Sequence, residues 1–264
     1  MRLGLTIVFN GLHHLQHNDW AKRMALFFDK WVIVEGLALN SGSTAWCRDL
    51  RNSNWHNEGL SKDGTTGFLY WLDKDYDNVT VLSDVWQSKD DMVNAGIQAF
   101  KTCCPIRHRD PEHFLWTLDV DEQFSEDDMI EAECMLGVTR GCNSAEFLSD
   151  YYVGEHLLAK GEWGEGVKLP YRRLWKWKGE RFISHEPPVM EGMTKPILLP
   201  QRFKHYAYYY EQDVKFKEQY YTGHDGIYSR WKKLQERPKE DFPVRISELI
   251  TGSWGQTDTQ IVYI

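Results

Sequence analysis

The chain has 264 residues, of which 42% are hydrophobic, enough for a packed core and too many for a disordered protein. Its formal net charge of −8 argues against a general nucleic-acid-binding protein, because such proteins carry a basic surface. The 5 cysteines are irregularly spaced, so we expect reduced thiols in the cytoplasm rather than disulfides or a structural zinc site. No segment reaches the roughly 20 apolar residues that a membrane-spanning helix needs, so we expect no transmembrane segment.

In the first half of the chain, short apolar runs alternate with segments of helical spacing. We expect strands at Leu3–Phe9, Trp31–Gly36, Val79–Leu82 and Phe114–Leu118, and helices at His14–Phe28 and Ser88–Phe100. The polar stretch Asn40–Gly67 has no clear period and is expected to be a loop. This alternation predicts an α/β fold with a mostly parallel central sheet flanked by helices. Ligands of such sheets bind beyond the carboxyl ends of the strands.

The second half has a different pattern. We expect an acidic helix at Ser125–Leu136, antiparallel strands at Ser144–Val153 and Tyr171–Trp177, an extended segment at Arg181–Pro188, a strand at Phe203–Tyr208, and helices at Asp213–Tyr221 and Tyr228–Gln235. No linker-like composition separates the two halves. We therefore predict a single domain, 1–264, in which residues 1–124 bind a nucleotide and residues 125–264 bind a second substrate.

The strongest chemical signal follows the fourth expected strand, where the apolar run stops at Asp119 and Asp121, and Glu122 comes next. Side chains at i and i+2 of an extended chain lie on the same side, so both carboxylates are expected to face one small volume. Two carboxylates that close repel each other unless a cation lies between them, and oxygen-only ligation suits Mg²⁺ or Mn²⁺. The pattern predicts a divalent cation that holds a phosphorylated substrate. The alternative is a strand exit with solvated acids.

Several other motifs accompany this one. They are Val32–Glu35, the loop Asn40–Thr44, the helical stretch Lys89–Ala99, Leu118–Glu122, and Arg173–Trp175 with His185-Glu186 downstream. Together they resemble glycosyltransferases of the GT-A fold, similar to the family-2-like enzymes of bacteria and viruses. The resemblance covers the whole chain loosely, and its most specific elements are Asp-x-Asp-Glu and His-Glu. The chain departs from the family at Glu35, where those enzymes have Asp with Gly-Ser-Thr close behind.

The resemblance implies a metal-dependent glycosyltransferase that takes a UDP- or GDP-sugar as donor and transfers the sugar to a hydroxyl of a glycan or glycoconjugate. Its cofactor would be Mn²⁺ or Mg²⁺, held by Asp121, with Asp119 reaching the ribose or the metal. A metal in that place would stabilise the negative charge on the departing diphosphate. The implied donor-binding set comprises Glu35, Asp84, Lys89, Asn94, Asp119 and Asp121.

The second half is expected to supply one more metal ligand, and a neutral imidazole is the commonest choice apart from a carboxylate. His185 and His205 are both candidates. Glu186 is a candidate general base that deprotonates the acceptor, with Asp150 and Glu155 as competing bases. An acidic base suggests inversion at the sugar carbon.

Two other functions stay open on the sequence. A nucleotidyltransferase or metal-dependent phosphotransferase would use the same acid pair, but it should carry a Gly-rich phosphate loop where Asn10–His14 stands. A non-catalytic carbohydrate-binding relative could keep the fold without the activity. The tract with His13, His14 and His17 follows the first strand. We interpret its members as loop or helix-start residues that could contact the donor.

Overall fold

The computed structural model describes residues 1–103, 113–163 and 170–264. The N-terminal half contains β1 (Arg2–Val8), α1 (Leu12–Gln16), α2 (Trp20–Phe27), β2 (Lys30–Glu35), β3 (His56–Asn57), β4 (Leu60–Ser61), α3 (Thr65–Asp75), β5 (Val79–Ser83), α4 (Lys89–Cys103), β6 (His113–Asp119) and β7 (Glu122–Gln123). The C-terminal half contains α5 (Glu126–Val138), β8 (Ser144–Gly154), β9 (Leu157–Lys160), β10 (Tyr171–Trp177), β11 (Phe182–Ser184), β12 (Val189–Met190), β13 (Ile197–His205), α6 (Glu211–Tyr220), α7 (Ile227–Gln235), β14 (Val244–Arg245) and β15 (Gln260–Tyr263).

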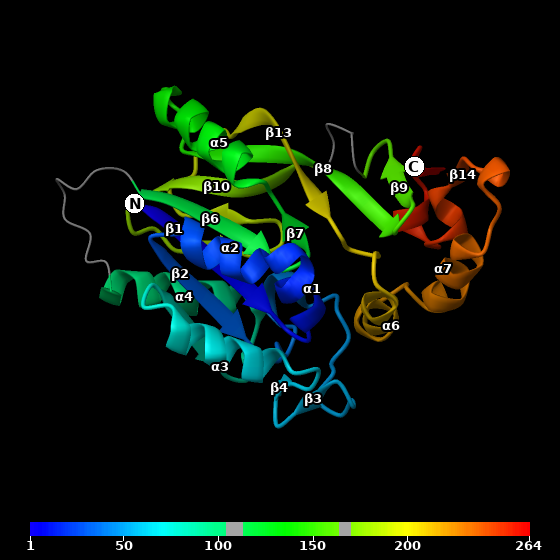
Figure 1. Cartoon of the computed structure of the whole chain (residues 1–264), viewed down its shortest axis with the longest axis horizontal. Helices are drawn as coiled ribbons and strands as arrows, with labels where there is room; N and C mark the ends of the chain where they lie inside the picture. The colour runs from blue at the N-terminus through cyan, green and yellow to red at the C-terminus, as the bar shows by residue number, and fades with distance from the viewer. Residues whose placement is uncertain (104–112, 164–169) are drawn as a thin grey trace.

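Within the described residues, one 11-stranded sheet runs through both halves of the chain (Figure 1). Its main path is β14-β15-β9-β8-β10-β6-β1-β2-β5, and β13 pairs with β8 and β7 beside this path. β5, β2, β1 and β6 are parallel neighbours, whereas β10 runs antiparallel between β6 and β8. The predicted α/β fold with a central sheet flanked by helices is confirmed. The two expected parts, 1–124 and 125–264, share this sheet.

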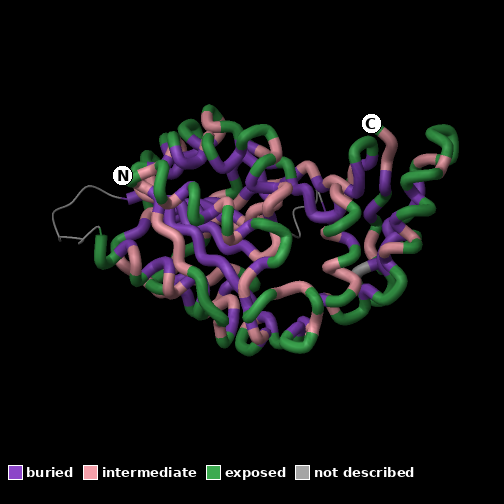
Figure 2. The backbone as a smooth tube through the Cα atoms, turned by 60° about the horizontal axis from the view of Figure 1, so that its bottom comes forward, coloured by how far each residue is buried: buried purple, intermediate pink, exposed green. Residues whose placement is uncertain are grey.

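Helices cover both faces of the parallel part of the sheet. In β2, alternate side chains point to opposite faces, as in any strand. Trp31 and Ile33 pack in one hydrophobic cluster with α2, α3 and α5, whereas Val32 and Val34 pack in another with α4. Because both faces are covered, β2 is apolar without alternation, which is typical of a buried parallel strand. Figure 2 shows the buried strands enclosed by more exposed helical turns.

Three predicted elements differ in extent. The expected helix at 14–28 is two helices, α1 and α2, because Asn18 and Asp19 take left-handed φ angles of 51° and 53° between them. The expected loop at 40–67 contains the β3–β4 hairpin and the start of α3. The strand expected to reach Tyr208 ends at His205, after which the backbone N–H of Tyr206 donates to the Asp121 carbonyl oxygen at 2.8 Å.

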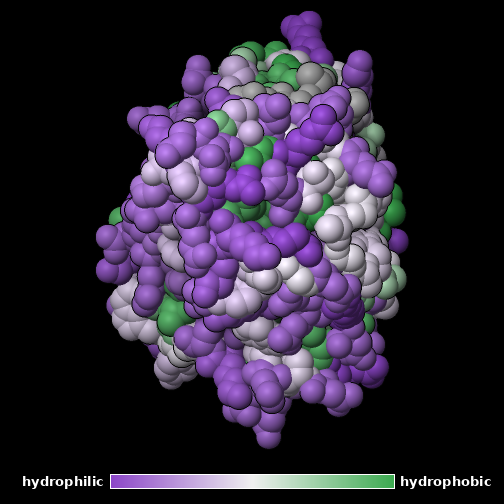
Figure 3. Space-filling view, turned by 90° about the vertical axis from the view of Figure 1, so that its right-hand side faces the viewer, coloured by the Kyte–Doolittle hydropathy of each residue, from purple (hydrophilic) through white to green (hydrophobic). Residues whose placement is uncertain are grey.

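The C-terminal elements form their own hydrophobic cluster, in which residues of α7, including Trp231, pack together with residues of β9 and β15. This part lies on the right in Figure 1, and its outer face is largely hydrophilic (Figure 3). In the portion of the chain that the structure describes, no helix is long and apolar enough to cross a membrane. Among the described residues, Cys47, Cys134 and Cys142 have free thiols. Cys104 lies outside the described residues.

Candidate active site

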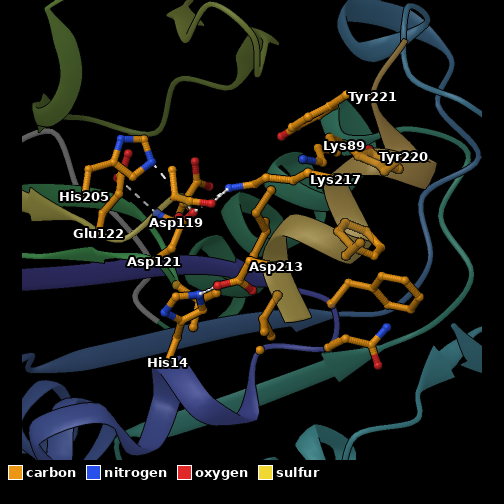
Figure 4. Close-up of a pocket in the computed structure, with 18 of the residues that line it drawn as sticks. His14, Lys89, Asp119, Asp121, Glu122, His205, Asp213, Lys217, Tyr220 and Tyr221 are labelled. Carbon is orange, nitrogen blue, oxygen red and sulfur yellow. Dashed lines mark hydrogen bonds and ion pairs between the residues drawn. The ribbon is translucent and has the colours of Figure 1, made fainter. Parts of the chain in front are cut away.

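A cavity of about 290 Å³ opens at the carboxyl ends of β1, β2 and β6, where open α/β sheets bind their ligands. Its walls come from both halves of the chain: the loops after β1 and β2, the turn Asp119–Glu122, and helix α6 (Figure 4). Gly36, directly after β2, has a φ of 127°, and a Cβ atom there would lie 2.0 Å from the Asp84 carbonyl oxygen. Glycine therefore allows the loop after β2 to approach the loop after β5.

Asp119 and Asp121 both line this cavity, and each has its own cationic neighbour. Asp119 Oδ2 lies 3.3 Å from Arg173 Nη2. Asp121 Oδ2 lies 3.4 Å from Lys217 Nζ and 3.7 Å from His205 Nε2. Burial acts to raise the pKa of Asp121, but Lys217 and His205 outweigh it and hold that pKa well below its usual range. Asp121 is therefore an anion that faces the cavity.

The turn that carries these acids rests on a buried ion pair. Glu122 is fully buried and accepts hydrogen bonds from Arg173 Nε at 2.5 Å and from Arg173 Nη2 at 2.6 Å. Glu122 Oε2 also accepts the backbone N–H of Asp119 at 3.3 Å. Burial raises the pKa of Glu122, and the guanidinium of Arg173 opposes that rise. Because Arg173 belongs to β10, the pair connects the antiparallel strand to the acidic turn and positions Asp119.

Lys89, the first residue of α4, brings a further positive charge to the cavity wall. Its Nζ lies 5.4 Å from the ring centre of Tyr220. Burial acts to lower the pKa of Lys89, but Tyr221, Asp119 and Glu186 outweigh it, so the pKa is raised. The ammonium group therefore stays charged inside a half-buried site.

Glu186 lines the same cavity from the loop that follows β11. The backbone of this loop is anchored to neighbouring elements. The N–H of His185 donates to Asp90 Oδ1 at 2.6 Å, and the N–H of Glu186 donates to Ser43 Oγ at 3.2 Å. These contacts fix the backbone that carries Glu186 at the cavity wall.

Two of the acids predicted to bind the donor do not line the cavity. Glu35 is fully buried and accepts hydrogen bonds from the Ser61 N–H at 2.8 Å and from Thr66 Oγ1 at 2.9 Å. Asp84 is exposed beyond the end of β5. Both acids end or follow a strand, but the Glu35 side chain points toward the β4–α3 connection and holds that connection in place.

The cavity lining also excludes three other predicted site residues, Asn94, Asp150 and His185. Asn94 holds β11 against α4, because its Oδ1 accepts the N–H of Phe182 at 2.9 Å and its Nδ2 donates to the carbonyl of Phe182 at 3.0 Å. Asp150 faces Arg202, whose Nη2 lies 2.9 Å from Asp150 Oδ1. His185 lines a small neighbouring hollow, where burial lowers its pKa to about 4.

The structure adds two residues of α6 to the site, Lys217 and Asp213, which are not among the candidates predicted from the sequence. Lys217 approaches Asp121 although the two are 96 residues apart in the chain. Asp213 accepts hydrogen bonds from His13 Nε2 at 2.8 Å and His14 Nε2 at 2.9 Å. The two histidines lie in α1, as expected of helix-start residues, and no feature of the sequence connects them with Asp213.

Comparisons with known proteins do not assign this chain to a family. No protein-family model matches the sequence, and no curated protein matches it. The chain is similar to a crystal structure of 4-diphosphocytidyl-2C-methyl-D-erythritol synthase, with a TM-score of 0.37 and 9% identity over 67% of this chain and 75% of that one. It is also similar to 2-C-methyl-D-erythritol 4-phosphate cytidylyltransferase from Francisella tularensis, with a TM-score of 0.31 and 10% identity over 91% and 83% of the two chains. Likenesses this loose assign neither an activity nor a substrate to this chain.

Proposed function

We propose that this protein is a glycosyltransferase that moves a sugar from a nucleotide-diphosphate donor to a hydroxyl of a glycan or glycoconjugate. One observation supports the proposal most. A cavity at the carboxyl ends of parallel strands holds an ionised acid, Asp121, between two cationic or metal-ligating groups, Lys217 and His205. Glu186 and Lys89 lie on the walls of the same cavity. The site therefore combines cationic side chains that could stabilise an anionic leaving group with a carboxylate, Glu186, that could accept the proton of the attacking hydroxyl.

The positive charges suit the leaving group. When the sugar departs, negative charge builds on the nucleoside diphosphate, and cations fixed in advance stabilise that charge most effectively. Lys217 and Lys89 both line the cavity, and the raised pKa of Lys89 keeps its ammonium charged. Arg173 is held by Glu122 through two hydrogen bonds, so its main role in the proposal is to position the acidic turn.

A divalent ion, Mn²⁺ or Mg²⁺, would be held by Asp121 and His205. Asp121 Oδ2 and His205 Nε2 lie 3.7 Å apart, so a carboxylate and an imidazole that both suit such an ion are close neighbours. His205 Nδ1 is buried without a hydrogen-bond partner among the described residues, so no such contact sets the tautomer of this ring. A bound ion would act as a Lewis acid on the diphosphate oxygens. Asp119, turned toward Arg173, would then contact the donor ribose.

Glu186 is the proposed general base. Burial raises its pKa, the nearby charge of Asp119 raises it further, and Arg173 and Lys89 oppose the rise. A carboxylate with a raised pKa is a stronger acceptor for the proton of the acceptor hydroxyl. In this mechanism Glu186 removes that proton as the oxygen attacks the sugar carbon from the side opposite the diphosphate, which would invert the configuration.

A thermal-shift screen of UDP-, GDP-, CMP- and dTDP-sugars, with and without Mn²⁺, tests the proposal. A ligand that binds the folded state raises the melting temperature by mass action. We expect a metal-dependent shift with one nucleotide class and a smaller shift in the Asp121→Asn variant. CTP serves as a further arm, because a shift with CTP and with no nucleotide sugar would favour nucleotidyl transfer instead. No shift with any of these ligands in a folded sample would overturn the proposal.

A further inference from the structure

A second cluster of potential metal ligands lies beside the acidic turn and takes no part in the mechanism above. His13 Nε2 and His14 Nε2 each contact a different carboxylate oxygen of Asp213, at 2.8 and 2.9 Å. These three side chains offer ligand atoms that all lie within 4.8 Å of one another. Figure 4 shows His14 of α1 pointing at Asp213 of α6 across the lower wall of the cavity.

The convergence of the two imidazoles is unusual for neighbouring helical residues. Successive side chains of an α-helix point about 100° apart, and i, i+1 pairs do not face each other. Here the ring centres of His13 and His14 lie only 4.2 Å apart, and both Nε2 atoms reach the same carboxylate. Tyr210 packs edge-on against both rings, at 4.8 and 5.3 Å. The packing therefore holds both Nε2 atoms beside one carboxylate.

Both Nε2 atoms point at Asp213, and each would bind an ion by giving up its hydrogen bond to that carboxylate. His14 is 3% exposed, and the Nδ1 atoms of His13 and His14 are buried without a hydrogen-bond partner in the described residues. The hydrogen bond to the Asp213 carboxylate places the proton of each neutral ring on Nε2, and no contact at Nδ1 would prevent its transfer to that atom when an ion binds. With the proton on Nδ1, each Nε2 presents a lone pair toward Asp213.

We propose that His13, His14 and Asp213 form a binding site for a divalent transition-metal ion of the zinc class. Two imidazoles and one carboxylate with open positions are a common ligand set for zinc and ferrous ions. The set contains more nitrogen than Mg²⁺ prefers, which distinguishes it from the oxygen-rich acidic turn. The ion would replace the protons that now link each Nε2 to the carboxylate.

The position of the site gives the ion a structural role. Asp213 belongs to the first turns of α6, and the same helix carries Phe216, Lys217 and Tyr220, which line the cavity. An ion bound by Asp213 and by the two histidines of α1 would tie the two helices together. It would thereby hold Lys217 beside Asp121. This inference does not depend on which reaction the cavity catalyses.

Zinc binding to the whole chain, measured by equilibrium dialysis with elemental analysis, tests the site. The parent protein for this experiment carries Asp121→Asn, so that the acidic turn does not compete for the ion. We expect one Zn²⁺ per chain, and Asp213→Asn in this background should weaken binding by more than about 10-fold, the smallest loss seen when even an outer-shell partner is removed. His156→Gln, which changes an exposed histidine elsewhere, is the matched control and should bind like the parent.

A second readout protects the test against a variant that fails to fold. His13→Gln and His14→Gln should each weaken zinc binding while circular dichroism stays that of the parent, and Co²⁺ in place of Zn²⁺ should give a visible absorption band that each variant loses. Equal zinc affinity in the parent and in all three ligand variants would overturn the proposal. Absence of any zinc binding by the folded parent would overturn it as well.

Discussion

Arg173 donates two hydrogen bonds, of 2.5 and 2.6 Å, to the fully buried carboxylate of Glu122. Removing only the cation would leave a buried anion without compensation, which costs about 3–5 kcal/mol. We therefore expect Arg173→Met to lower the free energy of unfolding by about that amount, measured by urea denaturation. The double variant R173M/E122M should recover most of the loss, because both polar partners are then apolar. Equal destabilisation in the single and double variants would contradict this account of the pair.

Asp121→Asn should lower sugar transfer by about 10²- to 10³-fold, the usual effect of removing one electrostatic group at a transition state. The amide keeps the size of the carboxylate but loses the charge that Lys217 and His205 face. Initial rates over a range of Mn²⁺ concentrations, with circular dichroism as the folding control, provide the measurement. A folded variant that transfers sugar at the full rate would exclude Asp121 from the metal site.

Glu186→Gln should leave donor affinity unchanged and lower the transfer rate by about 10²- to 10⁴-fold, because the amide cannot accept the acceptor proton. Donor affinity is measured by calorimetry and transfer by a coupled assay for the released nucleotide. Asp150→Asn tests the competing candidate base. It should transfer sugar like the wild type, since Asp150 contacts Arg202 away from the cavity. If Asp150→Asn loses the transfer step and Glu186→Gln does not, the base assignment is wrong.

Lys217→Met tests the positive charge on α6. Methionine retains much of the side-chain length, and with it the packing over Tyr208, where the Lys217 Nζ lies 4.9 Å from the ring centre. We expect kcat/KM for the donor to fall by about 10²-fold, with the loss of a group that meets the departing diphosphate. Lys217→Arg, which keeps the charge, should retain more activity than Lys217→Met. Equal losses in the two variants would indicate a packing role for Lys217.

Burial at His224 predicts a dependence of stability on pH. His224 Nε2 lies 2.9 Å from the Tyr208 hydroxyl, and burial lowers the pKa of this histidine from 6.5 to about 4. Between these pH values the unfolded chain binds a proton that the folded chain does not, so stability is present above pH 6.5 and falls as the pH drops toward 4. The loss is at most about 3 kcal/mol.

Urea denaturation at neutral pH and at about pH 4.5 measures this loss, because most of the proton uptake occurs above the folded-state pKa. His224→Gln does not titrate, so its stability should fall less than that of the wild type between the two conditions. An identical fall in both proteins would assign the acid sensitivity to other groups.

Local sequence patterns are sufficient for most elements of this fold. Apolar runs bounded by polar residues locate β1, β2, β5 and β6. For β1, β2 and β6, which lie inside the sheet, the physical reason is that a strand covered on both faces needs a mostly apolar run. Ser125 precedes a helical pattern, and its Oγ accepts the N–H of Asp128 at 3.1 Å in the cap of α5. Asp119 and Asp121 both line the cavity, as the Asp-x-Asp spacing predicts, although residues 120 and 121 form a turn rather than the extended backbone on which that prediction rests.

The partners of these acids depend on contacts across the fold. Arg173 and Glu122 are 51 residues apart, Lys217 and Asp121 are 96 apart, and His13 and Asp213 are 200 apart. Periodicity states which face of an element is buried, but it does not state which distant element covers that face. For the same reason Glu35 has a strand-end position yet turns toward Ser61 and Thr66 rather than into the cavity. Chemistry confined to one short segment is therefore readable from the chain, whereas an ion pair between segments exists only once the sheet and its helices have packed.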